Sequence, residues 1–78
     1  MPTVLRIGPY RFYFFSNEGS EPPHVHVDRD AYSAKFWLLD VSLARNHGFR
    51  PHELANLLAL VQEHRATILE AWHGYFGA

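Results

Sequence analysis

The sequence feature that most constrains the fold is a change of hydrophobic pattern at Pro51. Before it, short apolar and aromatic runs are separated by turn-forming residues, which is typical of β-strands. After it, apolar residues recur at intervals of three and four, which indicates a helix with one buried face. A chain with this order is predicted to be α+β: an antiparallel sheet of four to five strands followed by a long or broken C-terminal helix packed on one face. The helical series is Leu54, Leu57, Leu58, Val61, Arg65, Ile68, Leu69, Trp72 and Phe76, in which Arg65 is the one polar interruption.

Residues 3–45 predict four strands and a less regular fifth segment. Gly8-Pro9 separates the first two strands as a two-residue turn, because glycine suits the first position of a type II′ turn and proline the second. The second strand is aromatic on both faces, so we expect it to be covered on both sides or to lie at an interface. Residues 41–45 form either a short strand or an irregular connection, and residues 46–48 a turn. The four predicted strands are Thr3–Ile7, Tyr10–Ser16, Val25–Asp28 and Tyr32–Leu38.

The helix, at about residues 51–76, is long for a small domain. Pro51 suits the first helical position and Glu53 the positively polarised first turn. An unbroken helix over Pro51–Tyr75 would be about 37 Å long at ~1.5 Å per residue. The radius of gyration expected for 78 residues is only about 12 Å. The helix is therefore expected to break near Glu63–Ala66 or to protrude and pack on another subunit.

Composition narrows the class of protein. The 78 residues form one domain, and 47% hydrophobic residues suffice for a core. The chain has no cysteine, which excludes disulfides and thiolate metal sites. A net charge of -1 argues against a general nucleic-acid coat protein, although six of the seven Lys and Arg lie in residues 1–50. No segment reaches the ~18 apolar residues of a membrane span and no leader pattern is present. We therefore expect a cytoplasmic protein with no membrane contact.

Chemically versatile residues gather between Glu18 and Asp28, in the order Glu-Gly-Ser-Glu-Pro-Pro-His-Val-His-Val-Asp. The stiff Pro22-Pro23 pair fixes the point at which His24 enters the next strand. Alternate residues of a strand share one face, so His24, His26 and Asp28 are predicted to lie together. Two imidazoles and a carboxylate on one face are the groups that bind metals or move protons.

Three interpretations of this face stay open. The histidines could hold the loop in shape by hydrogen-bonding its backbone. They could bind a divalent metal, zinc or manganese, with Asp28 as third ligand or with Glu18 or Glu21 supplied by the loop; no other cofactor is expected. His24 and His26 could also be catalytic without metal, because an imidazole with a pKa of about 6.5 serves as acid or base. The supporting residues are Glu18, Glu21, Asp28 and Lys35, the last of which could hold a phosphate.

Aromatic residues crowd the second strand and the end of the helix. The run Tyr10–Phe15 could stack bases on an exposed sheet, which would make RNA a partner. Packing in the core or at an interface fits better, because Arg11 is the one basic residue within the run. The predicted interface residues are Phe12, Phe14, Trp72 and Phe76.

Several segments resemble a small bacterial family catalogued as domain of unknown function 4160. The central signature is Glu-Pro-Pro-His-Val-His-Val at residues 21–27. The resemblance covers almost the whole chain, although Arg50 departs from it, since relatives tend to have a serine-type cap there. The other matching segments are Thr3–Ile7, Phe14–Gly19, Ala34–Leu38, Leu43–Asn46 and Leu69–His73, together with Tyr75-Phe76.

The resemblance implies a role rather than a reaction. The family has no settled activity, and its members often look like one half of a two-gene module, in the manner of toxin–antitoxin pairs. The function expected from it is therefore that of a module component, acting through a small protein encoded by a neighbouring gene, with a homodimer as a second form of assembly. The alternatives are a metal-independent ribonuclease-type toxin using His24 and His26, and a metal-binding domain with a two-His, one-carboxylate site. Whether the protein is an enzyme stays open.

Overall fold

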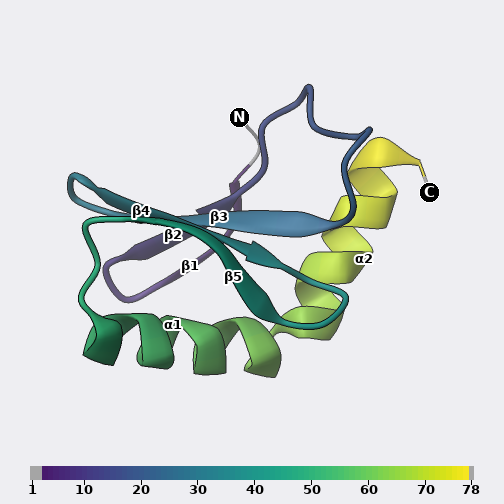
Figure 1. Ribbon diagram of the computed structural model, residues 1–78. Coiled ribbons are helices and arrows are strands. Elements are labelled where there is room, and N and C mark those ends of the chain that lie inside the picture. The colour runs from purple at the N-terminus through teal and green to yellow at the C-terminus, as the bar shows by residue number, and fades with distance from the viewer. Residues whose placement is uncertain (1–2, 78) are drawn as a thin grey trace.

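The computed structural model describes residues 3–77 and contains a five-stranded antiparallel sheet followed by two helices (Figure 1). The strands lie in the sheet in chain order, and each pairs with the next. This confirms the predicted α+β class. The strands are β1 (Thr3–Ile7), β2 (Tyr10–Tyr13), β3 (His24–Arg29), β4 (Tyr32–Trp37) and β5 (Ser42–His47), and the helices are α1 (Pro51–Glu63) and α2 (Arg65–Phe76).

Two strand boundaries differ from the prediction by more than one residue. β2 ends at Tyr13 rather than Ser16, because the chain leaves the sheet to begin the loop before β3. The fifth segment is a strand, with one irregularity in its pairing with β4. It continues through Asn46 and His47, which were wrongly assigned to a turn. Both residues pair with β4, and the chain turns only at Gly48, where φ is +102°.

The core lies between one face of the sheet and the helices. Phe12, Val27 and Ala34 are aligned across three neighbouring strands and are buried. α1 runs along this face, and α2 turns away past the end of the sheet (Figure 1). Because side chains alternate along a strand, the residues between these core positions point to the other face of the sheet. The core also contains Phe14, Val25, Phe36, Leu38, Phe49, Leu57, Val61, Ile68 and Trp72.

The helical region breaks at His64, within the predicted range, where φ is -102° and ψ is 13°. The break allows both segments to fit a domain whose radius of gyration is 11.5 Å. Arg65, the polar interruption in the apolar series, is the first residue of α2 after the break. Its Nε donates to the carbonyl oxygen of Leu38 at 2.6 Å and its Nη2 to that of Leu39 at 3.2 Å. The start of α2 is thereby tied to the connection between β4 and β5.

A charged network fixes α1 to the sheet. Arg29 of β3 donates from Nε and Nη2 to the two carboxylate oxygens of Glu53, at 2.6 and 2.8 Å. The hydroxyl of Tyr10 donates to the same carboxylate at 2.6 Å. The hydrogen bonds from Arg29 and Tyr10 lower the pKa of Glu53 to about 2. No helix within residues 3–77 is long and apolar enough to cross a membrane.

Candidate metal centre

The loop between β2 and β3 folds back over the start of β3. Two backbone hydrogen bonds tighten it, from Glu18 N–H to the Phe15 carbonyl at 3.4 Å and from Glu21 N–H to the Glu18 carbonyl at 3.1 Å. The end of the loop is held by Leu38, whose N–H donates to the carbonyl oxygen of Pro23 at 3.0 Å. These turns bring the Glu18 carboxylate to the first residues of β3.

Glu18, His24 and His26 form one compact cluster. One ligand atom from each lies within 4.8 Å of the other two, a grouping that could hold a metal ion. The Nε2 atoms of His24 and His26 each lie 2.9 Å from Oε1 of Glu18. Nε2 of His26 also lies 3.1 Å from the second carboxylate oxygen. Three potential ligands therefore converge on one point.

The backbone fixes the protonation of the His24 ring. Its Nδ1 lies 2.9 Å from the carbonyl oxygen of Pro22, and because a carbonyl oxygen only accepts, Nδ1 carries the proton. The second ring nitrogen, Nε2, faces the Glu18 carboxylate. This nitrogen is buried and has no hydrogen bond, although Oε1 of Glu18 is 2.9 Å away. A buried ring nitrogen beside a carboxylate oxygen needs a proton or a cation between the two atoms to be stable.

The Glu18 carboxylate is held in its ionised form. Partial burial acts to raise its pKa, but its contacts with the rings of His24 and His26 act in the opposite direction. The backbone N–H of Phe15, which donates to Oε1 at 3.1 Å, adds to this effect. The net result is a pKa below the usual value, so the carboxylate is charged at neutral pH.

Aromatic rings enclose His24. The rings of Trp37 and Trp72 lie 5.7 and 4.9 Å from it, measured between centroids, and the His24 side chain has no exposed surface. The surrounding apolar rings keep water away and lower the local dielectric. This strengthens electrostatic interactions within the cluster.

His26, the second histidine of the cluster, packs against two aromatic rings. Its ring stacks on Tyr13 at 5.3 Å and meets the edge of Phe15 at 4.7 Å. Burial lowers the pKa of His26, although the neighbouring Glu18 carboxylate acts to raise it. The neutral imidazole that results is the form that binds metals.

The other predicted supporting residues lie outside the cluster. Asp28 accepts a hydrogen bond from the hydroxyl of Tyr13 at 3.0 Å, and Glu21 forms an ion pair with Lys35 at 2.6 Å. The structure thus groups the two histidines with Glu18 of the loop. Glu18 was one of the two loop alternatives to Asp28, the strand residue named first as third ligand. The acid–base roles predicted for His24 and His26 stay predictions.

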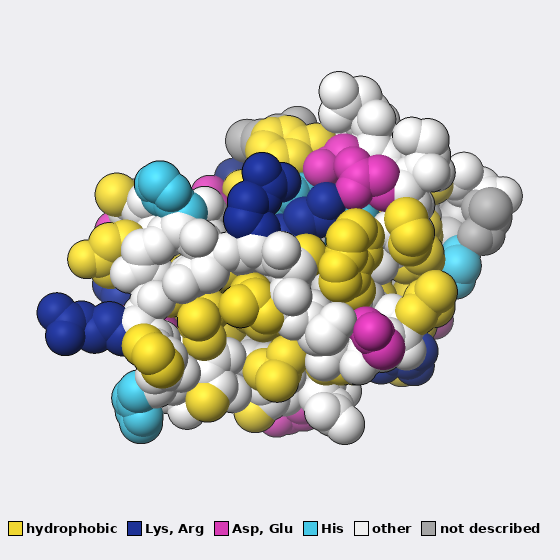
Figure 2. Space-filling model, in the orientation of Figure 1, with side chains coloured by type: hydrophobic (Ala, Val, Ile, Leu, Met, Phe, Trp, Pro, Cys, Tyr) yellow, Lys and Arg dark blue, Asp and Glu magenta, His cyan; other side chains and the backbone are white. Residues whose placement is uncertain are grey.

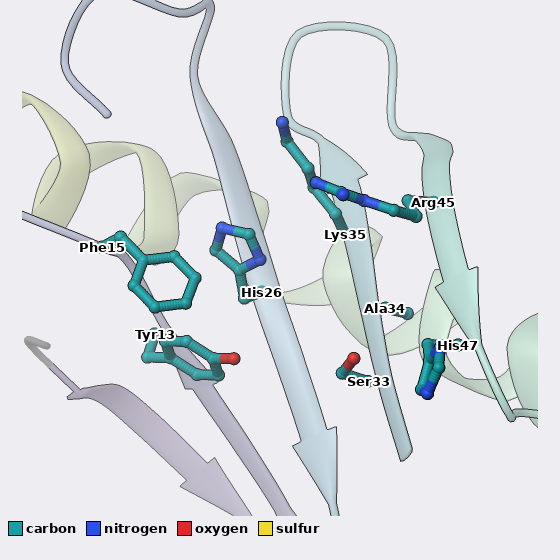
Figure 3. Close-up of a pocket in the computed structure, with 8 residues that line it drawn as sticks. All are labelled: Tyr13, Phe15, His26, Ser33, Ala34, Lys35, Arg45 and His47. Carbon is teal, nitrogen blue, oxygen red and sulfur yellow. The ribbon is translucent and has the colours of Figure 1, made fainter. Parts of the chain in front are cut away.

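A pocket adjoins the cluster (Figure 3). It lies on the face of the sheet opposite α1, whose place is seen in Figure 1. Its volume is about 380 Å³, and His26 forms part of its wall. Phe15 and Tyr13 lie on one side of His26, and Arg45 extends across β4 from the other side (Figure 3). The wall also includes Lys35, His47 and two small residues of β4, Ser33 and Ala34. Figure 2 shows basic side chains gathered beside acidic ones over this part of the molecule.

The sequence model of a family described as domain of unknown function (DUF4160) matches residues 10–73. The chain belongs to this family. The match spans the whole cluster and confirms the resemblance carried by the Glu-Pro-Pro-His-Val-His-Val signature. No curated protein and no solved structure matches the chain.

Within this DUF4160 domain, the residues predicted to form an interface are used by the chain itself. Phe12, Phe14 and Trp72 are buried in the core, and Phe76 packs against Trp72 at 4.2 Å between ring centroids. Their contact with a partner stays a prediction. Sequence reasoning missed that Phe76 also lies against Gly19 of the loop, because no pattern links residues so far apart.

The cluster has the chemistry of a metal centre. Two imidazole nitrogens and a carboxylate oxygen are ligands of zinc and related ions. The hydrogen bond from His24 to the Pro22 carbonyl is the kind of support that orients metal-bound histidines. Three protein ligands leave one position of a four-coordinate ion for water or another ligand, and a divalent ion lowers the pKa of bound water.

Proposed function

We propose that this protein binds a divalent transition-metal ion through Glu18, His24 and His26, with zinc as the preferred ion. The observation that carries the proposal is the buried Nε2 atom of His24, which faces Oε1 of Glu18 at 2.9 Å without a hydrogen bond. A cation at this point would satisfy both atoms. Zinc binds such nitrogen and oxygen ligands more tightly than manganese does.

The main competing interpretation is that the histidines act as acid and base on a substrate. The His24 side chain has no exposed surface, so a substrate cannot reach it in this conformation. A histidine that binds a metal ion can be fully buried, because it contacts the ion and not the substrate. The burial of His24 therefore favours metal binding over metal-independent catalysis.

Zinc titration of tag-free, metal-stripped protein, followed by calorimetry, tests the proposal. We expect one zinc ion per chain, with uptake strongly weakened in His24→Ala and in Glu18→Ala. His52→Ala is a matched control, because His52 is an exposed histidine of α1 away from the cluster. Equal zinc affinity in wild type and His24→Ala, or no zinc uptake by wild type, would contradict the proposal.

We also propose that the protein is one component of a two-gene module of the toxin–antitoxin type in the cytoplasm, and that it acts by binding the small protein of the neighbouring gene. The resemblance supports this role, and so does the amount of exposed apolar surface. Leu39, Leu43 and Tyr75 are 63%, 43% and 48% exposed, so these apolar side chains are accessible to a partner. β1 and β5 are the edge strands of the sheet, and edge strands are common pairing sites.

Co-expression with the neighbouring protein and measurement of the complex by size-exclusion chromatography with light scattering test this role. A stable complex would support it. Leu43→Glu should weaken the complex if the β5 side is used, whereas Glu63→Lys, an exposed change on α1, should not. A chain that elutes as a homodimer and ignores the neighbouring protein would contradict the heteromeric role.

A further inference from the structure

We infer that the pocket beside the cluster binds single-stranded nucleic acid, with Arg45 contacting a phosphate and Phe15 stacking on a base. The inference goes beyond metal binding and rests on the proposed function in one respect, the charge of the site. The cross-strand register, the exposure of the two residues and the composition of the pocket wall carry it.

The register of the sheet aligns the polar wall of the pocket. Tyr13 pairs with His26, His26 with Lys35, and Lys35 with Arg45, so that four neighbouring strands contribute to one row. Side chains at paired positions point to the same face. The row runs from an aromatic end to a basic end across the open face (Figure 3). This order fits a ligand with a flat apolar part next to an anionic part.

Arg45 is the cation that is available to a ligand. It is exposed, and within residues 3–77 it makes no ion pair. Lys35 differs, because it is paired with Glu21 at 2.6 Å and lies over the ring of Trp37. The guanidinium of Arg45 points across β4 toward His26 (Figure 3), and a guanidinium binds phosphate through two parallel hydrogen bonds. The exposed imidazole of His47 lines the same pocket.

Phe15 is the aromatic surface at the other end. Its side chain is 36% exposed, although its ring contacts Tyr13 at 5.5 Å and His26 at 4.7 Å. These contacts hold the ring at a fixed angle while a part of it stays accessible. Unstacked bases of single strands bind to such aromatic rings on open sheet faces. A pocket of about 380 Å³ is within the size range of sites for small ligand groups.

A metal ion bound to the cluster would make the charge of the site more positive and thus favour phosphate binding. Glu18 carries a negative charge next to His26, and a divalent ion bound there would reverse its sign. The whole chain has a net charge of -1, so general electrostatic attraction does not favour nucleic acid. Binding therefore depends on the local arrangement, which point substitutions can test.

The test is fluorescence anisotropy with labelled oligouridylate and labelled oligodeoxythymidylate, each with zinc-loaded and with metal-stripped protein. We expect wild type to bind with a Kd of about 10⁻⁶–10⁻⁴ M at moderate salt and more tightly with zinc. Phe15→Ala should weaken binding by about 5- to 150-fold, the loss of one stacked base. Arg45→Ala should weaken binding and reduce the slope of log K against log salt by about 0.7, the effect of one phosphate contact on a single strand.

Arg50→Ala is the matched control, since Arg50 is an exposed arginine that does not line the pocket. Circular dichroism checks that each variant folds. The inference is overturned if wild type binds neither strand, or if Arg45→Ala and Phe15→Ala bind as well as Arg50→Ala. Zinc uptake without oligonucleotide binding would overturn this inference alone. Oligonucleotide binding without zinc uptake would overturn the proposed metal function and support the pocket.

Discussion

The ring of Phe76 occupies the space that Gly19 leaves by having no side chain. A Cβ atom at residue 19 would come within 2.7 Å of Cδ1 of this ring. Gly19 follows Glu18 in the loop, and Phe76 is the last residue of α2. The end of the helix therefore supports the loop that carries the carboxylate of the cluster.

Gly19→Ala should displace the loop and weaken zinc binding. The added methyl group cannot coexist with the Phe76 ring in its present position, so Glu18 would move away from the histidines. Changes in groups that support a metal ligand cost about 10- to 100-fold in affinity, which zinc titration would measure. The double variant Gly19→Ala/Phe76→Ala should recover part of the affinity. If Gly19→Ala bound zinc as wild type does, the loop would not depend on this contact.

Glu18 and Asp28 should differ in their importance for metal binding. Glu18→Gln should lower zinc affinity by at least about tenfold, because an ionised ligand is replaced by a neutral amide. Asp28→Asn is the comparison, since Asp28 only accepts the hydrogen bond of Tyr13 and should leave zinc affinity nearly unchanged. Calorimetric titration of both variants measures the difference. If Asp28→Asn lowered zinc affinity more than Glu18→Gln did, Asp28 and not Glu18 would be the third ligand.

The Glu53 network should make stability depend on acid pH. The folded-state pKa of about 2 lies below the ordinary value of 4.5, so the folded state binds this proton less tightly than the unfolded state. The stabilisation is thus fully present above about pH 5 and is lost as the pH falls toward 2. Urea unfolding of wild type and Glu53→Gln across this range measures the effect.

In that experiment, the free energy of unfolding of Glu53→Gln should change less with pH than that of wild type. Glu63→Gln provides the control, because Glu63 is on the same helix but is 71% exposed and should keep the wild-type slope. Equal slopes for Glu53→Gln and wild type would show that the network with Arg29 does not shift the titration.

Two glycines should respond in opposite ways to the same substitution. Gly48 has a φ of +102°, and a Cβ there would lie 2.4 Å from the Tyr32 ring, so Gly48→Ala should destabilise the fold by about 1–3 kcal/mol. Gly74 is inside α2 with nothing within 4 Å of a Cβ, so Gly74→Ala should stabilise it by about 0.5–1 kcal/mol. Thermal or urea unfolding measures both. A destabilising Gly74→Ala would indicate that this turn of α2 contacts something outside the chain.

Local patterns predicted the strands and the first turn, because each depends on residues close together in sequence. The helix break was one of two alternatives, inferred from the length of an unbroken helix, and the structure has it at His64. The end of β5 was missed, since Asn46 and His47 are poor strand formers and only pairing with β4 keeps them extended. The third member of the cluster was underestimated for a similar reason. Period two in a strand pointed to Asp28, whereas the fold of the loop supplies Glu18.

The pocket could not be predicted from the sequence, because its wall comes from residues of four strands. A single-sequence pattern shows which residues of one strand share a face, but not which residue of the next strand lies beside them. The register of these strands depends on the lengths of the three connections between them. For this reason Arg45 was not among the predicted site residues.

The order of the strands has a consequence for how the molecule assembles. Each strand pairs with its neighbour in the chain, so the sheet can grow one hairpin at a time, and chains with such local contacts fold fast. Phe76, which supports the loop, lies at the end of α2 and follows all five strands in the chain. The sheet is thus ready early during translation, while the cluster is completed only when the final turn of α2 docks.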